Sequence, residues 1–262
     1  MYDLTQLESS LAQTIYARRL HYFPKIESTN ALAMQAAAAG VGEGSVFLAD
    51  QQTAGRGRNG HGWHSEEGAA ILVSVIFRPR LAPSRALWLS LMTGVAVHDA
   101  ITRTTGVECD LRWPNDLLIG KKKICGILTE ISADPEQLRF AVIGIGINVN
   151  QASFPPNIAH LATSLHIETG KSWSRTELLI ALLESLETEY RNALQNAASG
   201  NSALLHRLEK ISSYVRGKRV HVEEAGGYDG VTAGLDERGF LLVRTAEGIR
   251  TVISGGVGEK LS

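Results

Sequence analysis

The segment Gln52–Trp63, QTAGRGRNGHGW, constrains this chain most strongly, because it alternates glycine with arginine and contains no acidic residue. Glycine reaches backbone conformations that other residues avoid and lets bare N–H groups approach a ligand closely. Arg56 and Arg58 supply planar donor groups that suit a phosphate or a carboxylate. Such a segment does not form a packed core. We therefore predict a loop that becomes ordered around a small anion.

The same glycine–arginine pattern also occurs in disordered tails that bind nucleic acid, and in surface loops without a role. Here the segment lies between two apolar runs, Ser45–Ala49 and Ala69–Phe77, which we expect to be strands. A loop that connects two core strands is more often a functional site than a tail is. Its position therefore favours a site for an anion or a nucleotide.

Composition excludes several classes of protein. The 26 Lys and Arg residues are balanced by 27 Asp and Glu residues, which leaves no overall basic footprint for nucleic acid. No apolar run reaches the roughly 18 residues that span a bilayer, and the N-terminal segment lacks the pattern of a secretory signal. We therefore expect a cytoplasmic protein whose partners include neither nucleic acid nor membrane. Cys109 and Cys125 are predicted to be buried structural thiols, since no nearby His or Cys completes a zinc site.

Apolar periodicity predicts an α+β chain. Helices are expected over Leu4–Arg19, from Ser28 to about Ala39, over Pro83–Thr104 and over Ser174–Ala198. From Gly217 onward, short β runs separated by turns predict a small all-β module of about four strands. We expect a domain boundary between residues 214 and 215. The other predicted elements are strands at Leu20–Ile26, Val107–Trp113, Leu117–Ile119, Lys123–Ile131 and Leu138–Val149, and a helix at Ser202–Val215.

Two further segments carry polar groups at the ends of predicted strands. Asn115 and Asp116 follow a Trp-Pro pair and are either an ordinary turn or oxygen ligands for a divalent ion beside a phosphate. Lys121 and Lys122 are expected to be solvated residues of a hairpin turn. Lys123 differs from them, because it begins an apolar strand and has a glycine three residues later, which is suited to aiming it into a cleft.

The run Gly144-Ile145-Gly146-Ile147-Asn148 predicts a strand whose backbone a ligand approaches closely. It lacks the third glycine of the dinucleotide-binding fingerprint, and no phosphate-binding P-loop occurs elsewhere. The candidate groups are therefore Arg, Lys, Asn and Asp around glycine-rich backbone, which suits electrostatic handling of phosphate without a protein nucleophile.

Together these segments resemble the biotin protein ligases, or biotin–[acetyl-CoA-carboxylase] ligases. The resemblance implies a mixed sheet with helices on one face, followed by an SH3-like small barrel. It also implies that biotin and ATP form biotinyl-5′-AMP, with Mg²⁺, and that a lysine of a biotin carboxyl carrier protein then receives the biotinyl group. The matching pieces, in order, are Ser28-Thr29-Asn30, QTAGRGRNGHGW, RWPND, KKICGIL and GIGINVN.

The resemblance also implies roles for particular residues. Lys123, Arg56 and Arg58 would be catalytic, and Asn115 with Asp116 would serve the phosphates and Mg²⁺. The biotin site would comprise Ser28, Thr29, Asn30, Gln52, Gly55, Arg56, Gly57, Lys123 and Gly126. The ATP and adenylate site would comprise Arg58, Trp63, Asn115, Asp116, Lys123 and Asn148.

The sequence departs from the family pattern at Arg112, where a lysine is usual, at His61 and Gly62, where basic residues are common, and after the Gly255-Gly256 pair, where an acidic residue is usual. About 20 residues precede the matching pattern, so we expect no helix-turn-helix domain and no repressor activity. Dimerisation through a sheet edge is a further implication of the family. Two rival functions are a lipoate–protein ligase, which shares acyl-adenylate chemistry, and a non-catalytic RNA-binding module.

Overall fold

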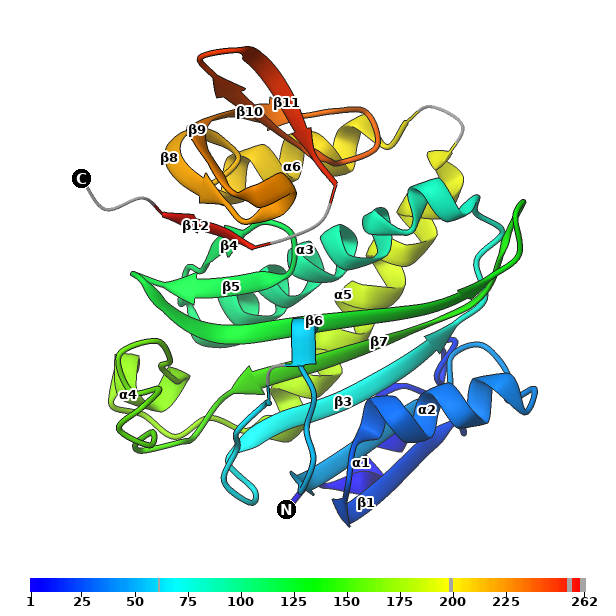
Figure 1. The fold of residues 1–262 in the computed structure, drawn as a ribbon. Coiled ribbons are helices and arrows are strands. Elements are labelled where there is room, and N and C mark those ends of the chain that lie inside the picture. Colours follow the sequence, from blue (N-terminus) through cyan, green and yellow to red (C-terminus); the bar gives the residue numbers. More distant parts are fainter. Residues whose placement is uncertain (61, 198–199, 254–255, 260–262) are drawn as a thin grey trace.

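The computed structural model describes residues 1–60, 62–197, 200–253 and 256–259. Its larger part is a seven-stranded mixed sheet with the order β1-β2-β3-β7-β6-β5-β4 (Figure 1). The β1–β2 pair is parallel, and the other neighbours in this sheet are antiparallel. The strands are β1 (Leu20–Ile26), β2 (Val46–Gln52), β3 (Ala70–Phe77), β4 (Asp110–Arg112), β5 (Asp116–Ile119), β6 (Lys122–Ala133) and β7 (Leu138–Asn148).

Helices cover both faces of this sheet, whereas the resemblance implied only one face. The long helices α3 (Leu87–Thr105) and α5 (Arg175–Gln195) lie behind the sheet in Figure 1, and α2 (Thr29–Ala38) lies in front of it. On the front face, Ala33 and Ala37 of α2 pack against Phe47 and Ile76 in a small second core. The short alanine side chains let α2 approach the strands closely, so this face is also sealed from water.

Strand β7 has a different chemical character on each face. Ile143, Ile145 and Ile147 are buried in the main core with the residues of α3 and α5. Because successive side chains of a strand point to opposite faces, Gly144 and Gly146 lie on the face that carries α2. This half of the face has no side chains from β7, and it lies beyond the first turn of α2. The fold therefore leaves a hollow beside the N-terminus of a helix.

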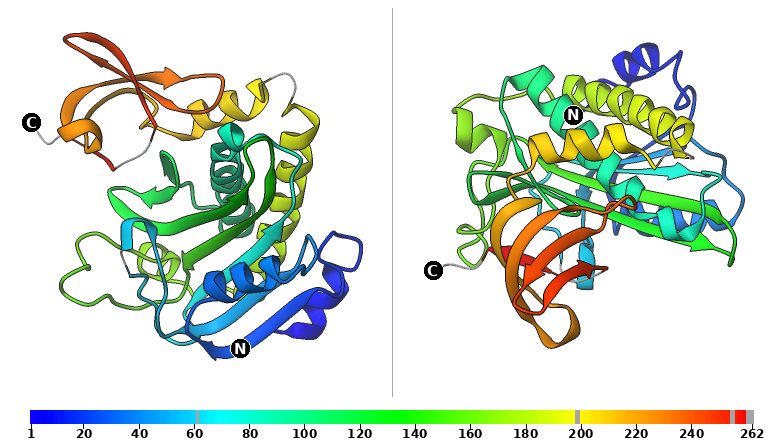
Figure 2. Two further views of the ribbon diagram at one scale, coloured as in Figure 1. Left: turned by 45° about the vertical axis from the view of Figure 1, so that its right-hand side comes forward. Right: turned by 90° about the horizontal axis from the view of Figure 1, so that it is seen from above.

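The C-terminal module follows α6 (Ser202–Ile211) and packs against the end of the sheet that carries β4 and β5 (Figure 2). Its strands form an antiparallel sheet in the order β11-β10-β9-β8-β12. The indole of Trp113 donates a hydrogen bond of 2.9 Å to the carbonyl of Gly239, which ties the two sheets together. The strands of the module are β8 (Arg216–Val222), β9 (Tyr228–Leu235), β10 (Leu241–Thr245), β11 (Gly248–Val252) and β12 (Val257–Glu259).

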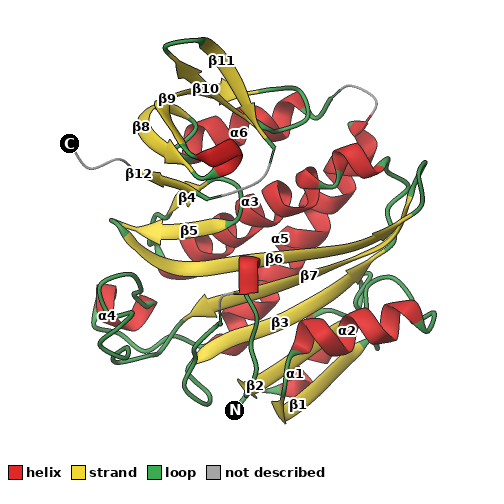
Figure 3. Ribbon diagram, in the orientation of Figure 1, coloured by secondary structure: helices red, strands yellow, loops and turns green. Residues whose placement is uncertain are grey.

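The small SH3-like β module is confirmed, with two corrections. It has five strands in place of about four, because β12 is a short strand in a glycine-rich segment that lacks the apolar alternation of the others. Within the described residues β11 and β12 are not paired with each other, so the module is an open sheet and not a closed barrel (Figure 3).

The first helix was also predicted wrongly. Helix α1 covers only Leu4–Ser10, because Leu11 already caps it and Arg18 has a φ of +58°, which a right-handed helix does not contain. The predicted strand Val107–Trp113 is shorter in the structure, where β4 covers only Asp110–Arg112. A short helix, α4 (Leu165–Thr169), was not predicted. The hairpin between β5 and β6 is confirmed, with Gly120 at a φ of +59° in its turn.

The predicted burial of both thiols is confirmed. Burial raises the pKa of Cys109 to about 12 and raises that of Cys125 as well, so both are protonated at neutral pH. Among the described residues no helix is long and apolar enough to cross a membrane.

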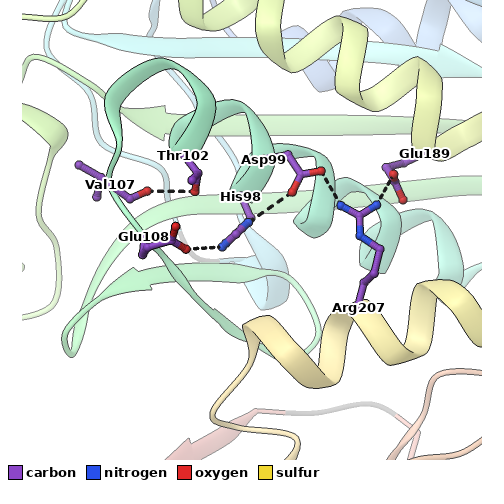
Figure 4. A network of polar contacts seen from close by, with 7 residues as sticks. All are labelled: His98, Asp99, Thr102, Val107, Glu108, Glu189 and Arg207. Carbon is purple, nitrogen blue, oxygen red and sulfur yellow. Dashed lines mark hydrogen bonds and ion pairs between the residues drawn. The ribbon is translucent and has the colours of Figure 1, made fainter.

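An ion-pair cluster joins α6 to the two long helices (Figure 4). The guanidinium of Arg207 on α6 donates to the carboxylates of Asp99 on α3 and Glu189 on α5. Asp99 also contacts His98, whose other ring nitrogen lies 3.1 Å from Glu108. The carboxylate of Glu189 is 7 % exposed, so it depends on Arg207 for compensation of its charge.

We predict that Arg207→Met lowers the free energy of unfolding by about 2 kcal/mol, because it leaves the buried carboxylate of Glu189 without its cation. Urea unfolding followed by circular dichroism measures this change. The exposed pair Arg250–Glu247 provides the control, and Arg250→Met should change stability by less than about 0.5 kcal/mol. Equal effects of the two variants would contradict this account of the cluster.

The same cluster predicts a dependence on pH. Burial alone would raise the pKa of Asp99, but hydrogen bonds from His98 and Arg207 outweigh it and lower the pKa below 3.8. The contribution of this carboxylate to stability is therefore complete above pH 3.8 and is lost as the pH falls through the folded-state pKa. We expect the stability difference between the wild type and Asp99→Asn to be constant at mildly acidic pH and to shrink below pH 3.8. Urea titrations at several pH values test this, and a difference that grows with acid would refute it.

Candidate active site

The hollow on the α2 face has a floor of bare backbone. In the strand register Leu72 of β3 pairs with Gly146, Gly146 pairs with Gly126 of β6, and Gly126 pairs with Asp116 of β5. A Cβ at Gly146 would lie 2.6 Å from the indole of Trp63, and one at Gly126 would lie 2.8 Å from it. The glycines are thus required for the indole to lie flat on the strands, where it lines the cavity.

The end of the cavity next to α2 is polar. Ser28 caps the helix, with its hydroxyl accepting from the backbone N–H of Ala31. Gln52 Oε1 accepts from the backbone N–H of Thr29 at 2.7 Å and from the Thr29 hydroxyl at 3.0 Å. Ser28 and Thr29 are buried and Gln52 is half-buried, and the N-terminus of a helix favours a polar or negative ligand.

A second polar chain, which the sequence reasoning missed, adjoins the first. Ser74 of β3 is fully buried, and its hydroxyl lies 2.8 Å from that of Thr29 and 2.9 Å from Asn30 Oδ1. Asn30 Nδ2 donates to the carboxylate of Glu130 at 2.5 Å. Glu130 follows Gly126 at an even distance along β6 and therefore shares its face, but this spacing alone does not distinguish it from the other residues of that face.

The opposite end of the cavity is cationic. Lys123 Nζ lies 2.6 Å from one carboxylate oxygen of Asp116, and Arg112 lies 2.6 Å from the other. Arg58 donates to Asn115 Oδ1 at 2.8 Å. Two cations thus contact a single carboxylate and a third is bonded to the neighbouring Asn115, which leaves a net positive charge at this end. Arg112 joins the site although it was noted only as a departure.

A β-bulge aims Lys123 into the cavity. The register between β5 and β6 shifts between Leu117 and Leu118, so that Ile124 and Cys125 are both buried in the core. Lys123 therefore lies on the same face as Gly126, although they are three residues apart and a regular strand would place them on opposite faces. Both residues line the cavity.

A second cavity adjoins the first and reaches the C-terminal module. Its walls combine the cationic end of the site with Glu223 and the segment 256–258 of the module. The five residues shared by both cavities are Gly57, Arg58, Trp63, Asn115 and Lys123. The two cavities thus form one continuous site, in which the cationic groups lie at the junction.

Most of the predicted site residues come together. Two of them, Gly55 and Asn148, line neither cavity. Gly55 packs against the backbone of Trp63, and the buried amide of Asn148 donates to the carbonyl of Thr163 and accepts from Gln151. His61 and Gly255 lie outside the described residues. The first cavity is lined by the predicted residues Ser28, Thr29, Asn30, Gln52, Arg56, Gly57, Arg58, Trp63, Asn115, Lys123 and Gly126, and Asp116 lines the second.

The arrangement does not fit direct binding of Mg²⁺ by Asn115 and Asp116. Both oxygens of Asp116 are engaged by cations, and the side-chain oxygen of Asn115 accepts from Arg58. In the described part of the chain, no three His, Cys, Asp or Glu residues are grouped so that they could hold a metal. Mg²⁺ is commonly bound through substrate phosphates and needs few protein ligands.

Comparison with known proteins agrees with this geometry. The family model "Biotin/lipoate A/B protein ligase family" matches residues 22–148, which contain the glycine floor and both polar ends. The model "Biotin protein ligase C terminal domain" matches residues 216–257, which form the C-terminal module.

Relatives match along nearly the whole chain. The biotin–[acetyl-CoA-carboxylase] ligase of Mycobacterium tuberculosis is 37% identical over 91% of this chain and 88% of its own length. The bifunctional ligase/repressor BirA of Bacillus spizizenii is 35% identical over 97% of this chain and 78% of its own length. The biotin protein ligase of Aquifex aeolicus, solved in complex with biotin and ATP, superposes with a TM-score of 0.79 at 31% identity and covers 94% of this chain and 100% of its own. The chain therefore belongs to the family of biotin protein ligases.

Proposed function

We propose that this protein is an ATP-dependent biotin–[acetyl-CoA-carboxylase] ligase, which converts biotin to biotinyl-5′-AMP and transfers the biotinyl group to a lysine of a biotin carboxyl carrier protein. The observation that carries the proposal is the continuous site, with a polar end, a glycine floor and a cationic junction. The Aquifex aeolicus ligase, which binds biotin and ATP, has the same fold.

The two ends of the site suit the two ends of biotin. Its cyclic urea carries one carbonyl and two N–H groups, which match the hydroxyls and the amide at the α2 end. Its carboxylate would then reach the junction beside Lys123. The second cavity would take ATP, with Trp63 beside the adenine and Arg58 beside a phosphate.

The first step brings together two anions. A biotin carboxylate oxygen attacks the α-phosphorus of ATP, an acyl–phosphate bond forms, and pyrophosphate leaves. Arg56, Arg58 and Lys123 would offset the repulsion between the reactants and stabilise the charge of the transition state. Asp116 holds the ammonium of Lys123 in place, and alignment of the two reactants can lower the barrier by roughly 7–11 kcal/mol.

In the second step the neutral amine of the acceptor lysine attacks the acyl carbon, the nitrogen loses a proton to solvent as an amide forms, and AMP leaves with the electron pair of the broken bond. The C-terminal module borders the second cavity, so an acceptor domain would approach near Glu223. Since the protein groups at Asn115 and Asp116 do not fit a metal, we propose that Mg²⁺ is carried by the phosphates and assign no step to it.

A lipoate–protein ligase is the second candidate, because the family model that matches residues 22–148 includes both activities. The polar end of the cavity favours biotin, since the dithiolane ring of lipoate has no hydrogen-bonding groups to pair with buried hydroxyls. The C-terminal module favours biotin as well, because its matching model is specific to biotin protein ligases.

The ligase domain would extend over residues 1–214 and the C-terminal module over 215–262. We propose a cytoplasmic enzyme without a DNA-binding role, because its net charge is −1. The outermost strand β1 offers an edge at which a homodimer would form, and sedimentation with and without biotin and ATP would measure its formation.

We predict that Lys123→Ala reduces biotin transfer at least about 100-fold, because the cation between the two reacting anions is lost. The assay incubates protein, ATP, Mg²⁺ and biotin with a carrier domain and reads the acceptor mass and the pyrophosphate released. Lys121→Ala is the matched control, since this lysine is exposed at the hairpin turn, and it should retain wild-type rates. A Lys123→Ala enzyme with the wild-type rate would sink the assignment, and a wild type that activates lipoate in preference to biotin would support the second candidate.

We also predict that Gly146→Ala raises the KM for ATP by about tenfold or more. The added Cβ would lie 2.6 Å from the Trp63 indole, which would be forced off the strands and away from the nucleotide. Steady-state adenylation kinetics measure this. Gly42→Ala serves as the control, because its Cβ would meet only the end of the flexible Arg19 side chain at 3.5 Å. An unchanged KM in Gly146→Ala would exclude the indole as a wall of the nucleotide site.

A further inference from the structure

We propose that Glu130 is a positioning residue for recognition of the biotin urea: through Asn30 it draws the Ser74 proton away from Thr29, so that the Thr29 oxygen is free to accept from a urea N–H. This inference rests on the proposed function. It concerns a hydrogen-bonded chain that runs from the rim of the cavity, where Glu130 lies beside Arg56 and Arg58, to its polar end.

The direction of the hydrogen bonds at Thr29 follows from a backbone group. The Thr29 N–H can only donate, so the Gln52 side-chain atom 2.7 Å away must be its oxygen. This oxygen also lies 3.0 Å from the Thr29 hydroxyl and therefore takes the hydroxyl proton. The Thr29 oxygen then faces its remaining neighbours with lone pairs and acts as an acceptor.

The orientation of the Asn30 amide follows from its contact with Glu130. A carboxylate only accepts, so the Asn30 group 2.5 Å from it is the NH₂, and the amide oxygen faces Ser74 at 2.9 Å. Gly144 makes room for this oxygen, because a Cβ there would lie 2.4 Å from it. Asn30 is 4% exposed, and of its partners Glu130 and Ser74 only Glu130 is restricted to accepting, so Glu130 selects the orientation of the amide.

Ser74 has one proton and two acceptors within reach, the Asn30 oxygen at 2.9 Å and the Thr29 oxygen at 2.8 Å. While Glu130 holds Asn30, the amide oxygen competes for this proton. If the acceptor at position 130 is lost, rotation of the amide is favoured, because a buried unpaired NH₂ is tolerated less than an under-satisfied carbonyl oxygen. The Ser74 oxygen then accepts a hydrogen bond from the Asn30 NH₂ group, and the Thr29 oxygen is the remaining acceptor for the Ser74 proton.

The consequence is a change in what the pocket recognises. With the Ser74 proton on Thr29, an incoming N–H meets an oxygen that has already accepted one hydrogen bond, so the urea is bound less tightly. A dithiolane ring, which offers no N–H, does not experience this competition. A pocket that hydrogen-bonds its ligand discriminates strongly against analogues without the matching groups, and Glu130 would maintain this discrimination from outside the first cavity.

The test compares Glu130→Leu with Glu130→Gln, which keeps an acceptor oxygen and removes only the charge. We expect Glu130→Leu to raise the dissociation constant of biotin, measured by calorimetry, by about tenfold, as for one weakened hydrogen bond to a buried acceptor. The KM for ATP and the affinity for lipoate should change less than the affinity for biotin. Glu130→Gln should bind biotin within about twofold of the wild type, which a purely electrostatic role of Glu130 would not allow.

The double variant Ser74→Ala/Glu130→Leu tests the role of the Ser74 hydroxyl proton. It removes the proton that competes at Thr29, so it should bind biotin more tightly than Glu130→Leu alone, which makes the two substitutions non-additive. Ser74→Ala alone should weaken biotin binding less than Glu130→Leu does, since its proton is not given to the ligand. This single variant also keeps the proposal testable if Glu130→Leu fails to fold.

Four results would overturn the proposal: wild-type biotin affinity in Glu130→Leu, an equal loss for biotin, lipoate and ATP, no recovery in the double variant, or an approximately tenfold loss in Ser74→Ala alone. These failures are distinct from failure of the proposed function. If the wild-type protein does not activate biotin, the function is wrong; if it does and these variants behave otherwise, only the role of Glu130 is wrong.

Discussion

The alternation of isoleucine and glycine along β7 is the constraint on which the rest of the molecule depends. One strand must supply apolar side chains to the core behind the sheet and bare backbone to the site in front of it. A shift of one residue in its pairing would exchange the two faces, because the side-chain period of a strand is two. It would place isoleucines under Trp63 and glycines against α3 and α5. Burial of Ile143, Ile145 and Ile147 therefore positions the glycine floor, so the same contacts support stability and binding.

The basic side chains around this glycine floor are held in place by neighbouring polar side chains. Asp116 engages Lys123 and Arg112 together, and Asn115 engages Arg58, so the long basic side chains are held before any ligand arrives. Preorganised cations in a site partly shielded from water stabilise developing negative charge more effectively than mobile ones, because they need no rearrangement during the reaction. Because both oxygens of Asp116 already contact these cations, its carboxylate does not fit the role of a metal ligand. At the polar end, hydroxyls and amides are held in place in the same way. The directions of their hydrogen bonds are set by groups that can only donate or only accept.

Much of this arrangement was predictable from short segments. Ser28 and Thr29 at a helix start, the glycine–arginine loop and the glycines of β6 and β7 each carry a local physical signature, and they meet in one cavity. Other features had no local signature. The chain between Leu11 and Arg19 keeps apolar spacing, but the helix already ends at Ser10, and Arg18 is left-handed. Strand β12 is too short to show a pattern, and Glu130 resembles any surface residue of a half-exposed strand until Asn30, from 100 positions earlier, is beside it.

The sequence by itself determined the α+β class, the β5–β6 hairpin and the small C-terminal β module, which follow from periodicity, turn chemistry and residue type, all local properties of the chain. Through its resemblance to the biotin protein ligases it also indicated most of the residues from which the site is built. Only the tertiary structure decided that α2 covers the face opposite α3 and α5, that a bulge at Ile124 turns Lys123 toward Gly126, and that Glu130, Asn30, Ser74 and Thr29 form one polar chain. Those outcomes depend on strand register and on contacts between distant segments, which are set by how the whole core packs and not by any stretch of sequence alone.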